Sequence, residues 1–272
     1  MSGTWKAFVE SCPLTYSSPN APTKEEILAT LVYSFLIGHR RYAHIAALFG
    51  VKTFRSQDSV RRAFEDADEE VITAWIDQQM DRTFAPLLAL DWALDVDATI
   101  KVLYGHQEEA RVGYNPTKPG RPSHVYQTMV LAPGKLVLNV DTQAGNQNAS
   151  EYAQPTLFGW LDARDRKLWP TFVRGDIAYG NENMMAGLEQ RKLPYLFKLR
   201  QTKNVSRKIG RLAKQGSKAE WNSTEQGWES LETTLRLEGW TRERRVIVSR
   251  RSCRRRRRRP VRRLRRDCVC RG

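Results

Sequence analysis

The chain is poor in cysteine over most of its length, which limits what can hold it together. Cys12 is the only cysteine among the first 250 of its 272 residues, and Cys253, Cys268 and Cys270 follow near the end. A single cysteine builds no disulfide framework, and a C-x-C pair without a nearby histidine is a poor zinc site. We therefore expect a protein of a reducing compartment.

Net charge is also missing from most of the chain, although the whole carries +15. Residues 242–272 hold 16 arginines, no lysine and two acids, which accounts for +14. The first 241 residues hold 29 basic and 28 acidic side chains, so they are almost neutral. A role in nucleic-acid binding must therefore be argued from local patches and motifs, and not from the overall charge.

Long apolar runs are absent as well. The most apolar helix-like segment, residues 27–38, has 12 residues, whereas a helix needs about 20 to span a bilayer. The first ten residues lack the basic start and apolar stretch of a secretory signal. Hydrophobic residues make up 40% of the chain and aromatic residues 10%, which suits a globular protein with a core. We expect a cytoplasmic protein with no membrane association.

Residues 23–90 have the pattern of helices. Thr23 followed by Glu26 forms the signature of a capping box, and an apolar run begins directly after it. This arrangement marks the start of a helix, because the two side chains bind the first free backbone N–H groups.

Two further helices are predicted over 42–49 and 59–67, and the second carries Arg61 and Arg62. Two short helices joined by a turn, the second of them basic, are compatible with a helix-turn-helix that contacts DNA. An ordinary three-helix packing unit with solvated arginines fits the same pattern. The sequence leaves both interpretations open.

From Ala93 the pattern changes to strands. An antiparallel hairpin is followed by alternating helices and strands, which predicts an α/β fold: a mixed sheet flanked by helices. This is the order of elements in the ribonuclease-H-like fold. The predicted order is strand, strand, strand, helix, strand, helix, strand, over 93–100, 124–131, 136–140, 148–162, 168–174, 181–190 and 195–200.

Four parts are expected along the chain. A helical N-terminal DNA-binding region, residues 1–90, precedes an incomplete ribonuclease-H-like catalytic core at 91–204. Residues 205–250 are polar and rich in tryptophan, with short alternating stretches that predict a β-rich insertion. Residues 251–272 form an arginine-rich tail, which is either disordered or read out of frame.

Two aspartates stand where neighbouring strands of such a sheet end. Asp97 lies in the first strand, and Asp176 follows the fourth. Carboxylates that converge in this way bind a pair of divalent ions, and hard oxygen ligands select Mg²⁺ or Mn²⁺ over zinc. An aspartate at a strand end is a weak signal alone, since Asp176 also suits a turn. Asp95 is a competitor for Asp97, because two residues of separation place both on one face of a strand.

Several segments of the chain resemble DDE-type transposases of bacterial insertion sequences. The stretch 94–108, LDVDATIKVLYGHQE, is similar to the first acidic motif of that family, and VRGDIAYG at 173–180 is similar to the second. The family is also matched, in order and spacing, by Gly113-Tyr114-Asn115-Pro116, Ala144-Gly145-Asn146 and the strand at 195–199.

The resemblance implies a metal-dependent enzyme that cleaves and joins DNA strands at the ends of an insertion sequence. Asp97 and Asp176 would be its catalytic, metal-binding residues. Arg174, Lys198 and His106 would lie near DNA phosphates, although surface or packing roles fit each of them equally well. The implied partners are the terminal inverted repeats of the transposon, the target DNA and a second copy of the chain in a synaptic complex. The implied location is a bacterial nucleoid.

The chain departs from the family after the β-rich segment. The family carries a third acid, a glutamate, on a helix at this point, and that pattern is absent here. None of the five nearby glutamates has an apolar helical period around it: Glu225, Glu229, Glu232, Glu238 and Glu243. We therefore expect strongly reduced or absent strand cleavage.

The tail itself suggests a cause for this departure. Six consecutive arginines, Arg254 to Arg259, and three cysteines in under twenty residues are typical of GC-rich DNA read out of frame. A frameshift near codon 250 is our preferred hypothesis, and sequencing the locus decides it. A genuine arginine-rich arm that binds phosphates is the alternative.

Three other functions compete with the transposase. A non-catalytic DNA-binding protein would tolerate Asp97→Asn and Asp176→Asn. Another ribonuclease-H-like nuclease would differ in its substrate, and the long β-rich segment argues against it. A glycosidase can also use two carboxylates, but the order of strands and helices does not indicate the barrel or sandwich that it would need.

Overall fold

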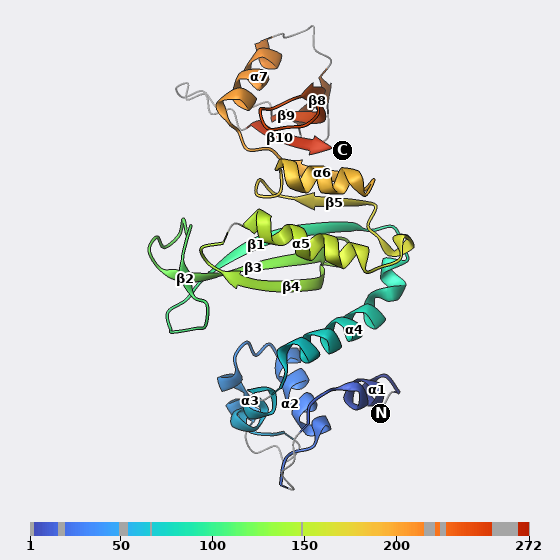
Figure 1. Ribbon diagram of the computed structural model, residues 1–272, viewed down its shortest axis with the longest axis vertical. Helices are drawn as coiled ribbons and strands as arrows, with labels where there is room; N and C mark the ends of the chain where they lie inside the picture. The colour runs from blue at the N-terminus through green and yellow to red at the C-terminus, as the bar shows by residue number, and fades with distance from the viewer. Residues whose placement is uncertain are drawn as a thin grey trace. The chain divides into compact units, whose positions relative to one another are not determined.

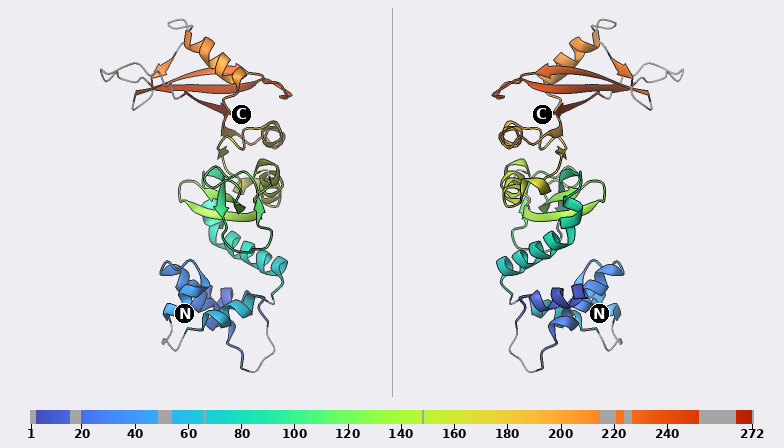
Figure 2. Two further views of the ribbon diagram at one scale, coloured as in Figure 1. Left: turned by 90° about the vertical axis from the view of Figure 1, so that its left-hand side faces the viewer. Right: turned by 90° about the vertical axis from the view of Figure 1, so that its right-hand side faces the viewer.

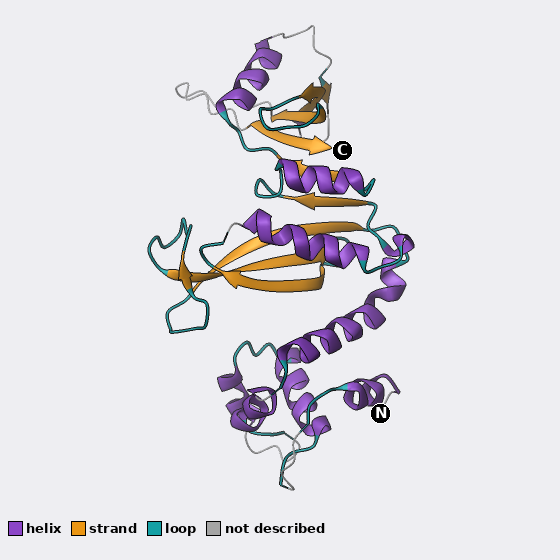
Figure 3. Cartoon of the chain, viewed as in Figure 1, coloured by secondary structure: helices purple, strands orange, loops and turns teal. Residues whose placement is uncertain are grey.

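A computed structural model describes residues 3–15, 20–48, 54–65, 67–147, 149–214, 221–223, 227–251 and 266–271. The chain divides into two compact units, Met1–Ala85 and Pro86–Gly272. Helices make up the described part of the first unit, and every strand that the structure describes belongs to the second (Figure 3). The mixed α/β class predicted from the sequence is therefore confirmed.

The first unit contains α1 (Gly3–Ser11), α2 (Lys24–Leu36), the 3₁₀ helix η1 (Tyr42–Leu48), α3 (Gln57–Glu65) and most of α4 (Glu69–Leu88). Thr23 caps α2, and its capping box with Glu26 is present as predicted. Buried apolar side chains from all five segments or the turns beside them form one core: Cys12, Leu14, Ile27, Leu28, Ile45, Leu48, Val60 and Trp75.

The segment predicted as a regular helix over 42–49 is a 3₁₀ helix in the structure. Such helices have poorer hydrogen-bond geometry and stay short. On α3, Arg61 contacts Glu65 at 2.7 Å and Asp58 at 3.9 Å. Two basic and two acidic side chains therefore balance on this helix. Arg62 is exposed, and its role in DNA binding stays a prediction.

The second unit is built on a mixed sheet (Figure 1). β4, β3, β1, β5 and β6 lie side by side in that order, and the short β2 pairs with the end of β3. β1 is antiparallel to β3 and parallel to β5, and β5 is parallel to β6. This is the strand order of the ribonuclease-H-like fold. The bounds are β1 Ala93–Val102, β2 Arg111–Val112, β3 Pro122–Leu131, β4 Leu136–Ala144, β5 Phe172–Gly175 and β6 Tyr195–Lys198.

Two helices cover one face of this sheet. α5 (Ala149–Asp162) and α6 (Glu182–Gln190) lie on the same side of the strands (Figure 2). They pack closely, since a Cβ added at Gly187 would lie 2.4 Å from the ring of Phe158. Buried residues of both helices and of β1, β5 and β6 form the core beneath them, among them Leu157, Leu161, Met184, Met185, Leu188, Leu94, Val173 and Phe197.

The segment after β6 begins with a helix that the sequence did not predict, α7 (Lys203–Lys214). The short β7 (Asn222–Ser223), β8 (Trp228–Leu235) and β9 (Arg244–Arg251) then form the expected β-rich part. β10 (Arg266–Arg271) pairs with both β6 and β9, so the sheet continues from the core into this region. The disorder expected for the tail is therefore wrong for residues 266–271. This segment is a strand because its backbone pairs with strands on both sides, although its sequence has no apolar pattern. Residues 252–265 lie outside the described part of the chain.

A buried arginine fastens the β8–β9 hairpin to α6. The Arg244 side chain is 2% exposed, and it donates to Glu189 at 2.7 Å and to Glu182 at 2.5 Å. Thr241 donates to the same Glu182 at 2.6 Å. Burial is the largest single effect and raises the pKa of each glutamate, but the hydrogen bonds from Arg244 and from the hydroxyls of Thr241 and Tyr195, together with the attraction of the arginines, lower the pKa of both below its ordinary value.

We predict that Arg244→Met destabilises the protein by about 3 kcal/mol at pH 7, because two partly buried carboxylates lose their cation. A glutamate whose pKa is lower in the folded than in the unfolded protein stabilises the fold. This stabilisation is complete above the pKa of the unfolded state, near 4.5, and is lost as the pH falls through the pKa of the folded state. The difference between variant and wild type must therefore shrink between pH 7 and pH 3. Urea unfolding at several pH values measures this. Arg242→Met is the control, since that exposed arginine lies 3.9 Å from Glu189; equal losses in both variants would contradict the prediction.

Candidate active site

The register of β1 and β5 determines where the two aspartates lie. Leu94 pairs with Val173, and Val96 pairs with Gly175. Asp97 and Asp176 are each the next residue in the same direction, so the parallel strands deliver them at one level. Neighbouring strands lie about 4.8 Å apart, so the register places the two aspartates side by side on adjacent central strands.

Tyr179 is a buried side chain close to both aspartates. Its side chain is 1% exposed, and its hydroxyl donates to Oε1 of Gln127 at 2.7 Å. Burial raises the pKa of Tyr179 strongly, and the negative charges of Asp97 and Asp176 raise it further. One buried hydroxyl is thus close enough to feel both aspartates, which agrees with the register.

The two carboxylates are both open to solvent but differ in their local bonding. Asp97 is exposed, and no described residue forms an ion pair with it. Asp176 is also exposed, and its Oδ1 accepts from the backbone N–H of Ala178 at 2.8 Å. The turn role that the sequence left open for Asp176 is therefore real. It uses one carboxylate oxygen and leaves the other available.

Asp95 is engaged elsewhere, which separates it from its competitor Asp97. Nε and Nη2 of Arg174 donate to its two oxygens at 2.7 and 2.6 Å. The two residues are register partners on adjacent strands, so the pairing follows directly from the sheet. Arg174, which the resemblance placed near DNA phosphates, thus has a carboxylate partner within the chain.

Gly175 lets the two strands approach without a side chain between them. A Cβ at this position would lie 3.0 Å from both Val96 Cγ2 and Tyr179 Cδ2, and 3.1 Å from Phe197 Cδ1. These contacts are on the face covered by α5 and α6. Because side chains alternate along a strand, Asp95 and Asp97 leave β1 on the opposite face.

The donor set suits a divalent cation but is small. Two adjacent carboxylates with free oxygens match Mg²⁺, which is commonly held by one or two carboxylates with water and substrate phosphates completing its shell. Among the described residues, no group of three or more His, Cys, Asp or Glu side chains could hold a metal ion. A third acid beside Asp97 and Asp176 is therefore missing from the described part of the chain.

The glutamates considered from the sequence as third acids have other surroundings. Glu229 and Glu232 pair across the hairpin with Arg250 and Arg245. Glu243 accepts from the Thr234 hydroxyl at 2.6 Å, and Glu238 is exposed in the loop between β8 and β9. Glu225 lies outside the described residues. No described member of this set joins the two aspartates.

The remaining predicted contacts are spread over the molecule. Lys198 is exposed at the end of β6, and His106 is exposed in the loop after β1. Neither has an ion pair among the residues that the structure describes. Their roles, like those of Arg61, Arg62 and Arg174, stay predictions.

Two glycines of the motifs mark a crossing of backbones. A Cβ on Gly113 would lie 1.8 Å from the carbonyl oxygen of Gly145. A Cβ on Gly145 would lie 2.4 Å from the carbonyl oxygen of Ser123 and 2.7 Å from that of Arg111. The loop after β1 and the segment after β4 therefore touch where no side chain fits.

Sequence reasoning missed Tyr179 and Gln127 as supports of the site. Tyr179 lies inside the second acidic motif, three residues after Asp176, and Gln127 is a buried polar residue of β3 between the buried apolar residues Val125 and Met129. A polar residue at a buried strand position was the available signal, since such a group needs a hydrogen-bond partner.

The family model described as Transposase DDE domain group 1 matches residues 25–257. The chain belongs to the DDE transposase family. No curated protein sequence matches it. Because the match includes both acidic motifs, the two aspartates lie within the DDE domain.

Solved structures similar to this DDE transposase are distant. A piggyBac transposase synaptic complex with hairpin DNA is 13% identical, with a TM-score of 0.44, and the match covers 97% of this chain and 56% of that one. The Mos1 transposase paired-end complex is 12% identical over 66% of this chain and 61% of that one, with a TM-score of 0.26. Endonuclease V of Ciona intestinalis, bound to DNA containing inosine, is 13% identical over 60% and 77%, with a TM-score of 0.25. The chain thus spans about half the length of the piggyBac protein.

No helix among the described residues is both long and apolar enough to cross a bilayer.

We predict that Gly175→Ala destabilises this DDE transposase by about 1–3 kcal/mol, because the methyl group overpacks the space between Val96, Tyr179 and Phe197. Gly159→Ala is the matched control: it lies inside α5, nothing is within 4 Å of its added Cβ, and alanine favours the helix by about 1 kcal/mol. Thermal and urea unfolding should therefore give opposite signs for the two variants. A neutral Gly175→Ala would refute the tight packing of Val96, Tyr179 and Phe197 around this position.

Proposed function

We propose that this chain is a metal-dependent DNA transposase that cleaves and transfers strands at insertion-sequence ends. In this proposal Asp97 and Asp176 hold Mg²⁺ or Mn²⁺. The main support for the proposal is the parallel register of β1 and β5, which places Asp97 and Asp176 at the same level on neighbouring strands. The bound ions would activate the attacking water or 3′ hydroxyl and stabilise the departing oxygen.

The chain's own residues have separate tasks in this proposal. Asp97 and Asp176 offer their oxygens on the face of the sheet that α5 and α6 leave open, where a DNA strand has access. Arg174 forms an ion pair with Asp95, so the Asp95 carboxylate next to the site is already neutralised. Tyr179 and Gln127 fix the floor of the site through one buried hydrogen bond.

A groove beside Asp97 supports access by DNA. It has a volume of about 590 Å³ and is lined by β1 residues 98–102, Tyr104 and residues 115–117. Tyr104 is 68% exposed, and the cations of Lys118 and Arg121 lie 5.1 and 5.6 Å from its ring centre. An exposed aromatic ring flanked by cations suits bases and phosphates of a nucleic acid.

The proposed partners are terminal inverted repeats, target DNA and a second copy of the chain in a synaptic complex. The proposed activity is impaired, because no third acid among the described residues completes the metal shell. A non-catalytic DNA-binding role remains the alternative. It is favoured by the same incomplete set of acids.

The metal site is tested by Mn²⁺ binding, followed by electron paramagnetic resonance. We expect the wild type to bind Mn²⁺, and Asp97→Asn and Asp176→Asn each to weaken binding at least tenfold, since each removes one of two charged ligands. The control is the double variant Asp95→Asn/Arg174→Gln, which removes the neighbouring ion pair without changing net charge. Its affinity should stay within about threefold of the wild type. Loss of binding in the control alone would assign the site to Asp95 and reject our assignment.

Catalysis is tested with Mg²⁺ and duplex DNA that carries the terminal repeats of the element. We expect strand cleavage to be very slow or undetectable, because two carboxylates hold the ions less well than three. Any residual cleavage should disappear in Asp97→Asn and Asp176→Asn. Robust turnover by the wild-type chain would overturn the proposed impairment, and residual cleavage that survives both variants would overturn the catalytic assignment.

A further inference from the structure

α7 carries a row of cations on one side and an apolar stripe on the other. Val205 and Ile209 are buried, whereas Lys203, Arg207 and Arg211 are exposed at intervals of one turn. Four residues of a helix rise about 6 Å, so the three charges follow one another along the helix. The helix contains no acidic residue, and its charges therefore repel one another unless an anion lies against them.

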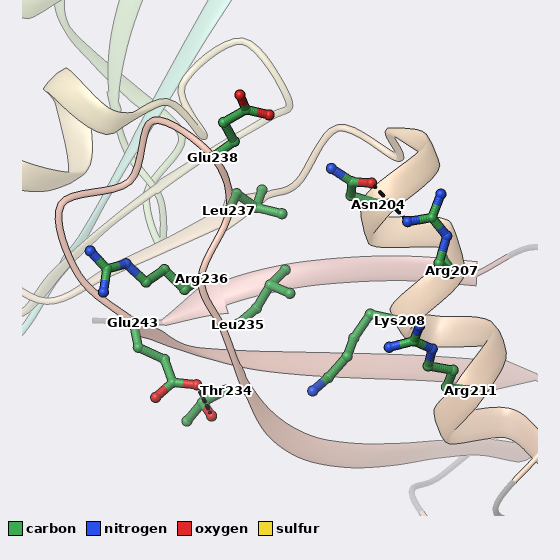
Figure 4. A pocket seen from close by; sticks show the side chains of 10 residues that line it. All are labelled: Asn204, Arg207, Lys208, Arg211, Thr234, Leu235, Arg236, Leu237, Glu238 and Glu243. Atoms are coloured by element: carbon green, nitrogen blue, oxygen red, sulfur yellow. Dashed lines mark hydrogen bonds between the residues drawn. The ribbon is translucent and has the colours of Figure 1, made fainter.

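Arg207 and Arg211 of this row, together with Lys208, line a groove between α7 and the β8–β9 hairpin (Figure 4). The groove has a volume of about 430 Å³. One wall is α7 with Asn204, Arg207, Lys208 and Arg211; the other wall is formed by Thr234, Glu243 and the loop residues 235–238. Arg236 adds a fourth cation from this second wall, so positive charge borders the groove on both sides.

The charges of this groove are unpaired in a region where other arginines are paired. Arg244, Arg245 and Arg250 on β9 each contact a glutamate at 2.5–2.7 Å. Within the described ranges, by contrast, Lys208, Arg211 and Arg236 form no ion pair. Arg207 has one long hydrogen bond, to Asn204 at 3.3 Å.

Two acids, Glu238 and Glu243, also line the groove. They leave an excess of two positive charges, and Glu243 already accepts the Thr234 hydroxyl. Glu229, Glu232 and Glu243 are thus bound within the hairpin, and among the described residues none of them forms an ion pair with a cation of α7.

The shape and charge together select the ligand. The lining cations are exposed or half-buried, so the groove lacks the enclosed charged pocket that holds a small anion. A regular row of cations along an open groove matches a chain of phosphates, and neutralising such phosphates releases condensed counterions. We propose that α7 and the β8–β9 loop bind the phosphate backbone of duplex DNA. This inference rests on the proposed transposase function and gives its DNA a second contact surface, distinct from the two aspartates.

The first test is a lysine footprint on the wild-type chain. Acetylation of each lysine is measured by mass spectrometry with and without a 30-base-pair duplex of mixed sequence, in EDTA. We expect the duplex to protect Lys203 and Lys208 at least fivefold. Lys135, Lys167 and Lys192 are internal controls, because these exposed residues precede β4, β5 and β6 at the other end of the strands. Equal protection of both groups, or protection of neither, would reject the groove.

The second test compares matched triple variants in the same buffer. Arg207→Gln/Lys208→Gln/Arg211→Gln should raise Kd at least tenfold at 100 mM NaCl. It should also reduce the slope of log Kd against log salt by about 2–3, since each phosphate contact contributes about 0.9. The control, Lys135→Gln/Lys167→Gln/Lys192→Gln, loses the same charge and should change neither quantity by more than its error. Equal effects in both variants would mean that only overall charge matters and would overturn the proposal.

A charge-preserving variant distinguishes binding from folding. Arg207→Lys/Arg211→Lys should keep the wild-type salt slope, and circular dichroism should show the same thermal transition in all variants. The binding buffer contains no divalent ion, so the outcome is independent of the metal site. A chain that binds Mn²⁺ but shows no α7-dependent DNA binding refutes the groove alone, and the reverse result refutes the metal assignment alone.

Discussion

Parallel pairing of β1 with β5 is the constraint on which the candidate site depends. Asp97 and Asp176 are 79 residues apart in the chain, and only the register Leu94–Val173 and Val96–Gly175 brings them to one level. A shift of one residue would turn every side chain of β5 to the other face. The buried residues on the helix-covered face prevent such a shift, because Val173 and Phe197 would then lose their places in the core. The apolar core thus fixes the position of two exposed acids.

The same two strands also give four charged side chains different roles. Asp95 and Arg174 neutralise each other two residues before Asp97 and Asp176, and no described residue forms an ion pair with those two aspartates. Like charges held together cost stability, and proteins keep such arrangements at sites where a ligand supplies the missing charge. The difference between the paired Asp95 and Arg174 and the unpaired Asp97 and Asp176 arises only when the two strands lie side by side in the sheet. It cannot be read from either strand alone.

Much of the fold followed from the sequence, because its signals are local. The capping box at Thr23 and the strands predicted over 93–100, 124–131 and 195–200 lie close to elements of the structure. The choice between Asp95 and Asp97 required the partner strand, since both face the same way. The α7 segment does carry a helical signal, since Val205, Ile209 and Leu212 follow the i, i+4, i+7 spacing, but the polar composition of residues 205–250 favoured a β-rich interpretation. β10 was missed because its own sequence has no strand pattern, and it becomes a strand only by pairing with β6 and β9. The support from Tyr179 and Gln127 depends on a contact between residues 52 apart, which no local pattern contains.

The crossing of Gly113 and Gly145 has a consequence for how such a protein can vary. Most of its interior can exchange one apolar side chain for another of similar volume, with neighbours adjusting. At the crossing, carbonyl oxygens occupy the space that any side chain would need, and a backbone cannot change rotamer to make room. Neither position therefore accepts a residue larger than glycine, whatever the composition of the surrounding loop. What restricts Gly113 and Gly145 is the position of neighbouring backbone atoms, and not the volume of the side chains packed around them.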